Sequence, residues 1–442
     1  MKAKFVVFSF IFIILSCDNS QIKNPQENPS EKVLFKKIDA NHSGVRFNNT
    51  LKQTADFNFM NYFYIFMGGG VATGDIDNDG LIDLYFVSNV GPNKLYKNKG
   101  DFTFEDITVS SKTEDYSGFS TGVFMWDANN DGWLDIYVCK AGFPKQPELR
   151  KNLLFINNRN GTFTESAQKM GLDDPGFSTQ AYPIDYDGDG DLDLFVLNHR
   201  YDFENNGKVS AQLQANTEEA VTDQLYRNDA GTFSKVTREA GLLSKAWGLS
   251  AVISDFNDDG WDDIYVANDF MEPDFLYINQ KNGSFKNEIN ARFKHISNFS
   301  MGSDYADLNN DLNKDLVTLD MVSESHERSK ENMASMSTPN FLKMVEIGYH
   351  HQYMTNTLHW GDSYGNFRET SQMSGISKTD WSWTPLLADF DNDGYKDIFI
   401  SNGIITCIVD THFDTNPFFY FLFYLYIYYH SNCMLFFICI IH

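Results

Sequence analysis

The chain has 442 residues and a formal net charge of −25, and 42% of its residues are hydrophobic and 15% aromatic. That apolar content is enough for a buried core and excludes a disordered acidic protein. The negative charge argues against nucleic acid or an anionic membrane surface as a partner. We therefore expect a folded, acidic protein whose negative charge has a local use.

The N-terminus predicts secretion and lipidation. Lys2 and Lys4 precede an apolar run at residues 5–15, and Ser16 and Cys17 follow it. This order is typical of a lipoprotein signal peptide over residues 1–17, with Cys17 as the lipidated residue. An ordinary signal peptide with an incidental cysteine is the alternative. Residues 18–32 form a polar tether, so we expect a protein anchored by lipid in a bacterial cell envelope, at the outer membrane.

An acidic nonapeptide, DIDNDGLID, follows at residues 75–83. Alternating carboxylates in a tight turn converge on a hard cation such as Ca²⁺, and Gly80 at position 6 lets the chain wrap around the ion. An EF-hand needs a glutamate at position 12, where this chain has Phe86 inside a strand-like run, so that motif is excluded. The predicted ligands are the aspartates at positions 1, 3, 5 and 9: Asp75, Asp77, Asp79 and Asp83.

Five more nonapeptides repeat this pattern, at residues 127–135, 185–193, 255–263, 307–315 and 389–397, and we number the six loops in chain order. A single copy could be an ordinary acidic turn, but six aligned copies predict up to six Ca²⁺ sites. Loop 5 has Leu312 in place of the glycine, so its ion is expected to be weakly held or absent. The side-chain ligands predicted in loops 2 to 6 are Asp127, Asn129, Asp131, Asp135, Asp185, Asp187, Asp189, Asp193, Asp255, Asn257, Asp259, Asp263, Asp307, Asn309, Asp311, Asp315, Asp389, Asp391, Asp393 and Asp397.

Strand-like runs flank every loop and predict the fold. A second hairpin follows in five of the six units, with turn signals such as Asn160-Gly161. Two hairpins make four strands per unit, which is the size of a propeller blade. We therefore predict an all-β propeller of four-stranded blades over residues 33–404, with a Ca²⁺-binding loop in the first hairpin of each blade.

Two insertions, at residues 198–222 and 321–355, occur at the same place in their units, so both should emerge on one face of the propeller. The second predicts a short amphipathic helix, which either packs on the propeller or contacts a ligand. Its apolar residues are Met333, Met336, Phe341, Met344 and Val345.

The blades resemble the FG-GAP or VCBS-type repeats of integrin α-subunits. More closely, the chain resembles the cartilage acidic proteins and the bacterial lipoproteins with an ASPIC/UnbV domain. The resemblance rests on the six loops, on LYxN and NG-x-F hairpins, and on the segment GYHHQYMTNTLHWG at residues 348–361. It implies a seven-bladed ring and a C-terminal ASPIC/UnbV module, neither of them complete here. It also implies that the carbonyl of loop position 7 binds Ca²⁺, at Leu81, Trp133, Asp191, Trp261 and Tyr395, with Asn313 at that place in loop 5.

Residues 405–442 no longer follow the acidic, turn-rich pattern of the repeats and are rich in aromatic residues. We therefore interpret them as an aberrant end from truncation or a frameshift. A membrane helix is the alternative, although a polar break interrupts the apolar runs.

Two functions fit the sequence. The first is a non-enzymatic binding or adhesion module for protein or glycan ligands. The second is an enzyme that processes extracellular glycans on the insertion-bearing face. His350, His351 and His359 are the best candidates for catalysis or a transition metal, and packing or surface roles are the alternative.

Overall fold

The structure is a computed structural model that describes residues 35–203, 221–331, 338–403 and 437–441. The chain divides into two compact units, Met1–Lys37 and Ile38–His442, and the second is described below. The predicted signal peptide, Cys17 and the tether lie outside the described residues, as do most of the first insertion and most of the predicted aberrant end.

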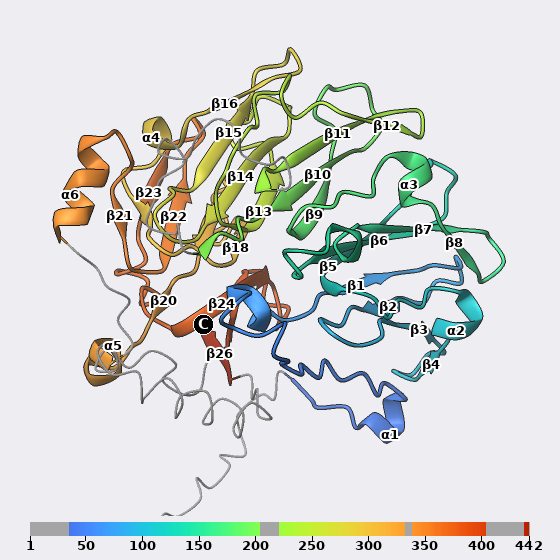
Figure 1. The fold of residues 1–442 in the computed structure, drawn as a ribbon. Helices are drawn as coiled ribbons and strands as arrows, with labels where there is room; N and C mark the ends of the chain where they lie inside the picture. Colours follow the sequence, from blue (N-terminus) through green and yellow to red (C-terminus); the bar gives the residue numbers. More distant parts are fainter. Residues whose placement is uncertain (1–34, 204–220, 332–337, 404–436, 442) are drawn as a thin grey trace, which may run out of the picture. The chain divides into compact units, whose positions relative to one another are not determined.

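Six four-stranded antiparallel sheets follow one another along the second unit and form the six blades of a β-propeller (Figure 1). The prediction of a propeller with four-stranded blades is confirmed. In the first five blades, an acidic loop joins the first and second strands, and a second hairpin joins the third and fourth. The resemblance implied seven blades, and the described residues form six.

The strands of blades 1 to 3 are β1 (Val71–Gly74), β2 (Asp83–Phe86), β3 (Lys94–Asn98) and β4 (Phe104–Asp106), then β5 (Phe119–Trp126), β6 (Asp135–Ala141), β7 (Leu153–Asn157) and β8 (Phe163–Glu165), then β9 (Ser178–Ile184), β10 (Asp193–Asn198), β11 (Gln224–Asp229) and β12 (Thr232–Lys235). The strands of blades 4 and 5 are β13 (Gly248–Ser254), β14 (Asp263–Asn268), β15 (Phe275–Asn279) and β16 (Phe285–Asn287), then β18 (Ser303–Ala306), β19 (Asp315–Thr318), β22 (Thr357–Gly361) and β23 (Phe367–Glu369).

Blade 6 is assembled from three parts of the chain. Loop 6 joins β24 (Asp380–Ala388) to β25 (Asp397–Asn402), as in the other blades. The strand β20 (Met321–Val322) comes from the second insertion and pairs with β24. The strand β26 (Phe437–Ile441) pairs antiparallel with β25, so the predicted aberrant end contributes one strand to this sheet.

Short helices and one parallel strand pair complete the unit. The pair is β17 (Ile296–Ser297) with β21 (Gln352–Tyr353). The helices are α1 (Ala40–Ser43), η1 (Phe63–Phe66), α2 (Thr108–Ser111), η2 (Pro147–Leu149), α3 (Ala167–Met170), α4 (Ile289–Arg292), α5 (His326–Glu331) and α6 (Thr338–Glu346). Within the described residues, no helix is long and apolar enough to span a bilayer.

The predicted amphipathic helix corresponds to α6, which contains Phe341, Met344 and Val345. All three side chains are half-buried, and the Phe341 ring stacks on Tyr353 with 5.6 Å between ring centroids. Met333 and Met336 lie outside the described residues.

Five apolar clusters each lie between two consecutive blades. The packing of β14 explains why its sequence is almost continuously apolar. Ile264 and Val266 point into the cluster with blade 3, and Tyr265 and Ala267 point into the cluster with blade 5. Successive side chains of a strand alternate between its faces, so a strand that is covered on both sides needs apolar residues throughout.

A sixth cluster lies at the ends of the strands, on the face opposite the acidic loops. We call that face the insertion face, because the connections from second to third strands emerge there, and we call residues 57–67 the plug. Phe57, Tyr62 and Tyr64 of the plug pack with Phe119 and Trp247. This plug was not predicted from the sequence.

Polar bonds fix the plug in place. The hydroxyl of Tyr62 lies 3.0 Å from Nε2 of His199, and Tyr64 donates a 2.9 Å hydrogen bond to Oδ2 of Asp269. His199 follows β10 of blade 3, and Asp269 follows β14 of blade 4. The plug is therefore bonded to two neighbouring blades on the insertion face. Burial lowers the pKa of His199 to about 4, which keeps the imidazole neutral at ordinary pH.

Candidate metal loops

The first aspartate of each loop folds the turn. In loop 1, Oδ1 of Asp75 accepts the amide of Asp79 at 3.1 Å, and Oδ2 accepts the amide of Gly80 at 2.8 Å. The same two bonds recur in four other loops, at Asp127, Asp255, Asp307 and Asp389. In loop 3, Asp185 accepts the amide of Gly188 at 2.9 Å. These side chains replace backbone partners that a tight turn cannot supply.

The ninth residue holds the loop to the sheet. Oδ2 of Asp135 accepts the amide of Ala128 at 3.0 Å, and Oδ1 accepts the amide of Asn157 on β7 at 2.7 Å. Loops 1, 3, 4 and 5 repeat this double bond. The sequence predicted this aspartate only as a ligand, whereas its oxygens also join the loop to the third strand.

All six ninth-position carboxylates are buried: Asp83, Asp135, Asp193, Asp263, Asp315 and Asp397. Burial raises the pKa of Asp135, Asp193 and Asp263 to about 7 and that of Asp315 to about 6. Desolvation disfavours the charged carboxylate, and the neighbouring loop aspartates add repulsion. A cation within reach would favour the charged form.

Loop position 6 adopts a left-handed backbone in all six loops. The φ angle is +87° at Gly80 and +93° at Gly394, and Leu312 adopts +74° in loop 5. A Cβ at Gly80 or Gly394 would meet no atom within 4 Å, so the glycine is required by the backbone angle and not by crowding. Leu312 therefore keeps the shape of the loop at a conformational cost.

The residue at position 4 also has a left-handed backbone, which was not predicted from the sequence. Its residues are Asn78, Asn130, Gly188, Asp258, Asn310 and Asn392, all with positive φ. Asparagine, aspartate and glycine tolerate this region best, so the residue types are a signal that could have been used. In loop 3 there is a second reason for glycine, because a Cβ at Gly188 would lie 2.5 Å from Cη2 of Trp261 in loop 4.

Position 3 of loops 1, 2 and 3 has the property expected of a metal ligand, whereas Oδ1 at position 3 of loops 4, 5 and 6 accepts the amide of position 5. Oδ1 of Asp77, Asn129 and Asp187 is buried and has no hydrogen-bond partner among the described residues. Oδ1 of Asp191, at position 7 of loop 3, is likewise buried and has no hydrogen-bond partner among the described residues. A buried oxygen without a partner is costly, and oxygen atoms are the ligands that Ca²⁺ prefers. The residues present therefore fit a hard cation.

Three loops bring carboxylate oxygens together within 4.8 Å of one another, and each group comprises positions 1, 3 and 9: Asp75, Asp77 and Asp83 in loop 1, Asp185, Asp187 and Asp193 in loop 3, and Asp389, Asp391 and Asp397 in loop 6. Loops 2, 4 and 5 have asparagine at position 3, which provides an amide oxygen in place of a carboxylate. At positions 1, 3, 5 and 9, these three loops therefore carry three carboxylates in place of four.

Position 5 caps the turn and meets a basic side chain in three loops. Oδ1 of Asp79 accepts the amide of Leu81 at 2.9 Å, and its Oδ2 lies 3.3 Å from Nζ of Lys97, which also pairs with Asp77. Arg159 lies 2.9 Å from Asp131, and Lys281 lies 3.3 Å from Asp259. These cations come from the second hairpins of blades 1, 2 and 4 and compensate part of the loop charge.

The candidate histidines do not form such a group. His359 is buried, and its Nε2 lies 3.0 Å from the carbonyl oxygen of His295, while the rings of His350 and His351 are 6.2 Å apart. Among the described residues, the groups with three ligand atoms within 4.8 Å contain only loop aspartates. The ring of His359 packs edge-on against Phe293 at 4.8 Å, and its Nδ1 is buried without a hydrogen-bond partner among the described residues.

A family model described as "FG-GAP-like repeat" matches residues 75–138, 146–196, 255–318 and 346–400, which is more than half of the chain. The chain belongs to the FG-GAP-like repeat family. Each matched FG-GAP segment ends within the second strand of a blade, namely β6, β10, β19 and β25. Each matched segment therefore begins in the part of the chain that belongs to one blade and ends in the next blade.

The curated relatives are animal proteins. Cartilage acidic protein 1 of Xenopus tropicalis is 27% identical over 201 residues, covering 45% of this chain and 28% of the relative. The human protein of the same name is 24% identical over 221 residues, covering 50% and 31%. Integrin alpha-8 of Gallus gallus is 29% identical over 146 residues, covering 29% and 14%. The match thus spans less than a third of each relative's length.

Among solved structures, the V. cholerae biofilm matrix protein Bap1 aligns with a TM-score of 0.34 and 13% identity, covering 73% of this chain and 47% of that one. The FG-GAP repeats and the relation to cartilage acidic protein and integrin α chains are confirmed by the family and relative matches. The relation to ASPIC/UnbV lipoproteins stays a prediction.

Proposed function

We propose that this FG-GAP propeller binds Ca²⁺ in its acidic loops and serves outside the cytoplasm as a binding or adhesion module for protein or glycan ligands. The single observation that carries the proposal is the buried, unpartnered Oδ1 at position 3 of loops 1, 2 and 3. Leaving such an oxygen unsatisfied costs about 1–3 kcal/mol. A bound Ca²⁺ removes that cost, since it accepts six to eight oxygen ligands.

The positions of each loop have different roles in such a site. Positions 1 and 9 already have backbone amides on their oxygens, so they shape the loop and still offer lone pairs to an ion. At position 3 of loops 1, 2 and 3, the buried Oδ1 has no hydrogen-bond partner among the described residues and can turn to the ion. Loop 3 has aspartate at positions 1, 3, 5, 7 and 9 and should bind most tightly, whereas loop 5 has asparagine at position 3 and the strained Leu312.

The binding role rests on the architecture. Hydrogen bonds join neighbouring blades on the loop face, while the connections on the insertion face differ in length, and a scaffold with connections of this kind is suited to recognition. We propose that the chain is secreted and anchored through a lipid on Cys17, because a lipobox-like cysteine follows its apolar N-terminal run. A Cys17→Ser variant should then move from the membrane fraction to the soluble fraction in a bacterial host, and unchanged fractionation would contradict the anchor.

The ions themselves can be counted. We expect wild-type protein, dialysed against Ca²⁺ and then gel-filtered, to retain several Ca²⁺ ions per chain by elemental analysis. Asp187→Ala should remove one ion, and Asp311→Ala, in loop 5, should remove less. Mg²⁺ should replace Ca²⁺ poorly, because it requires a smaller and stricter octahedral site. Equal losses in the two variants, or a wild-type protein without Ca²⁺, would overturn the proposal.

A further inference from the structure

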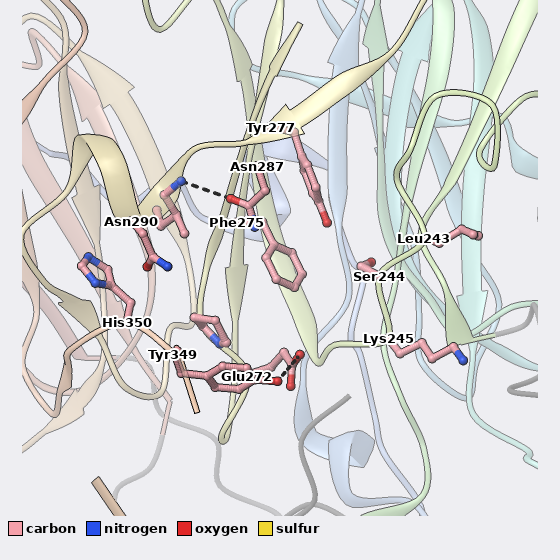
Figure 2. A pocket seen from close by; sticks show the side chains of 13 residues that line it. Leu243, Ser244, Lys245, Glu272, Phe275, Tyr277, Asn287, Asn290, Tyr349 and His350 are labelled. Carbon is pink, nitrogen blue, oxygen red and sulfur yellow. Dashed lines mark hydrogen bonds between the residues drawn. The ribbon is translucent and has the colours of Figure 1, made fainter. Parts of the chain in front are cut away.

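A pocket of about 490 Å³ lies beside blade 4. Its walls come from three segments that are distant in the sequence: the connection from β12 to β13, the region from Glu272 to Asn290, and the end of the second insertion at Gly348, Tyr349 and His350. Figure 2 shows Phe275 between Lys245 on one side and Tyr349 on the other. The volume is within the range of small-ligand sites.

The pocket is built and not merely left over between blades. Tyr349 donates a 3.0 Å hydrogen bond to Oε1 of Glu272, which fixes the insertion against blade 4 (Figure 2). His350, at the same wall, is only 8% exposed, so a packed residue closes this side of the pocket.

The chemistry of the lining selects the ligand class. Phe275 and Tyr277 line the apolar side of the pocket with the edges that the core leaves accessible, 9% and 7% of each residue, and Asn287 and Asn290 are exposed amides at the rim. Lys245 and Glu272 add one positive and one negative charge to the lining. Aromatic rings pack on the apolar face of a sugar ring, while amide and charged groups bond its hydroxyls.

We propose that this pocket is the glycan-binding site of the propeller and that it accepts one or two rings of a neutral oligosaccharide. The proposal rests on the binding function proposed above and specifies its ligand class and place. A neutral glycan is favoured over an acidic one, because the chain has a net charge of −25 and repels polyanions at long range. The pocket is also partly formed by the second insertion, which is on the insertion face.

The test is a calorimetric titration of the Ca²⁺-supplemented full chain. The ligands are a panel of neutral gluco-, manno-, galacto- and xylo-oligosaccharides. We expect at least one to bind, with at least tenfold weaker binding to Asn290→Ala and to Lys245→Ala. Asn48→Ala, at an exposed asparagine of the region before blade 1, is the matched control and should bind like wild type. Thermal unfolding of each variant should match wild type, which separates lost contacts from lost folding.

The proposal is overturned if no neutral oligosaccharide binds at millimolar concentration, or if both pocket variants bind like wild type. Binding of only acidic oligosaccharides or only peptides would also contradict it. None of these outcomes bears on the Ca²⁺ count or on Ca²⁺-dependent unfolding, so a failure of this site is distinguishable from a failure of the metal loops.

Discussion

The side chain of Asn157 in blade 2 donates a 2.8 Å hydrogen bond from Nδ2 to the carbonyl of Ile76, the second residue of loop 1 in blade 1. The same Nδ2 donates to the carbonyl of Leu134 in its own loop at 3.1 Å. Asn279 in blade 4 repeats the relationship with Tyr186 in loop 3, at 2.8 Å. At these two junctions, between blades 1 and 2 and between blades 3 and 4, one asparagine therefore joins two neighbouring loops.

Asn157→Ala should destabilise the protein by about 2 kcal/mol, because it leaves two carbonyl oxygens without their donor in a buried place. Denaturant unfolding at constant Ca²⁺ measures this change. The control is Asn158→Ala, whose side chain bonds only exposed threonines, and its effect should stay within about 0.5 kcal/mol. Equal effects of the two variants would show that the bond between loops has no energetic weight.

Leu312→Gly should stabilise loop 5 by about 0.5–1 kcal/mol. Release of the left-handed strain gains about 1–2 kcal/mol, and the greater freedom of glycine in the unfolded chain removes part of that gain. The reverse change, Gly394→Leu in loop 6, should destabilise by a similar amount, since the φ angle there is +93° and space for the side chain is open. If both variants shift the unfolding midpoint in the same direction, the backbone explanation is wrong.

Lys97→Met should raise the affinity of loop 1 for Ca²⁺ about threefold, because the ammonium of Lys97 pairs with Asp77 and Asp79 and competes with a cation there. Calorimetric titration of Ca²⁺ reports the change in Kd. Lys99→Met removes the same charge from a side chain that lies on Glu105, away from the loop, and is the matched control. A uniform effect of both variants would point to net charge alone.

Asp269 makes stability depend on pH. Burial raises its pKa to about 7, with Asp320 adding to the effect, whereas the unfolded carboxyl titrates near about 3.9. Between these values the folded state holds a proton that the unfolded state has lost, so this group makes stability fall as pH rises from about 4 to about 7. The asparagine side chain of Asp269→Asn cannot ionise, so this variant should not lose stability in this way as pH rises.

The free energy of unfolding of Asp269→Asn, relative to wild type, should therefore increase from pH 5 to about pH 7 and level off by pH 8, with a slope of at most about 1.4 kcal/mol per pH unit. Denaturant unfolding at four pH values in chelator measures it. Glu105→Gln, at the surface, controls for the loss of a carboxylate. A constant difference over this range would mean that Asp269 is ionised in the folded protein.

The loops and hairpins could be predicted because their causes are local and repeated. Alternating carboxylates, a glycine at position 6 and turn residues such as Asn160-Gly161 act within a few residues, and six copies reinforce the pattern. The double role of Asp135 could not be predicted from its loop alone, since one of its two amide partners, Asn157, lies on another strand. A one-dimensional pattern shows ligands but not the bonds that orient them.

The plug escaped prediction for a related reason. Residues 57–67 belong to no repeat, and their defining bond joins Tyr62 to His199, 137 residues away. The same contacts change the boundaries of the first insertion, because Asn198, His199 and Thr222 are buried and belong to the propeller. The predicted first insertion, residues 198–222, therefore included residues at both ends that hold the fold together.

The most direct test of the account is thermal unfolding of the full chain in Ca²⁺ and in a chelator such as EGTA, at one pH and protein concentration. A site held at a hundred times its Kd adds about 2.7 kcal/mol of stability, and several such sites in adjoining loops should raise Tm in Ca²⁺ by many degrees. Mg²⁺ at the same concentration should restore little of that increase. Identical Tm values in Ca²⁺ and in EGTA would contradict the account and leave the six acidic loops as solvated turns.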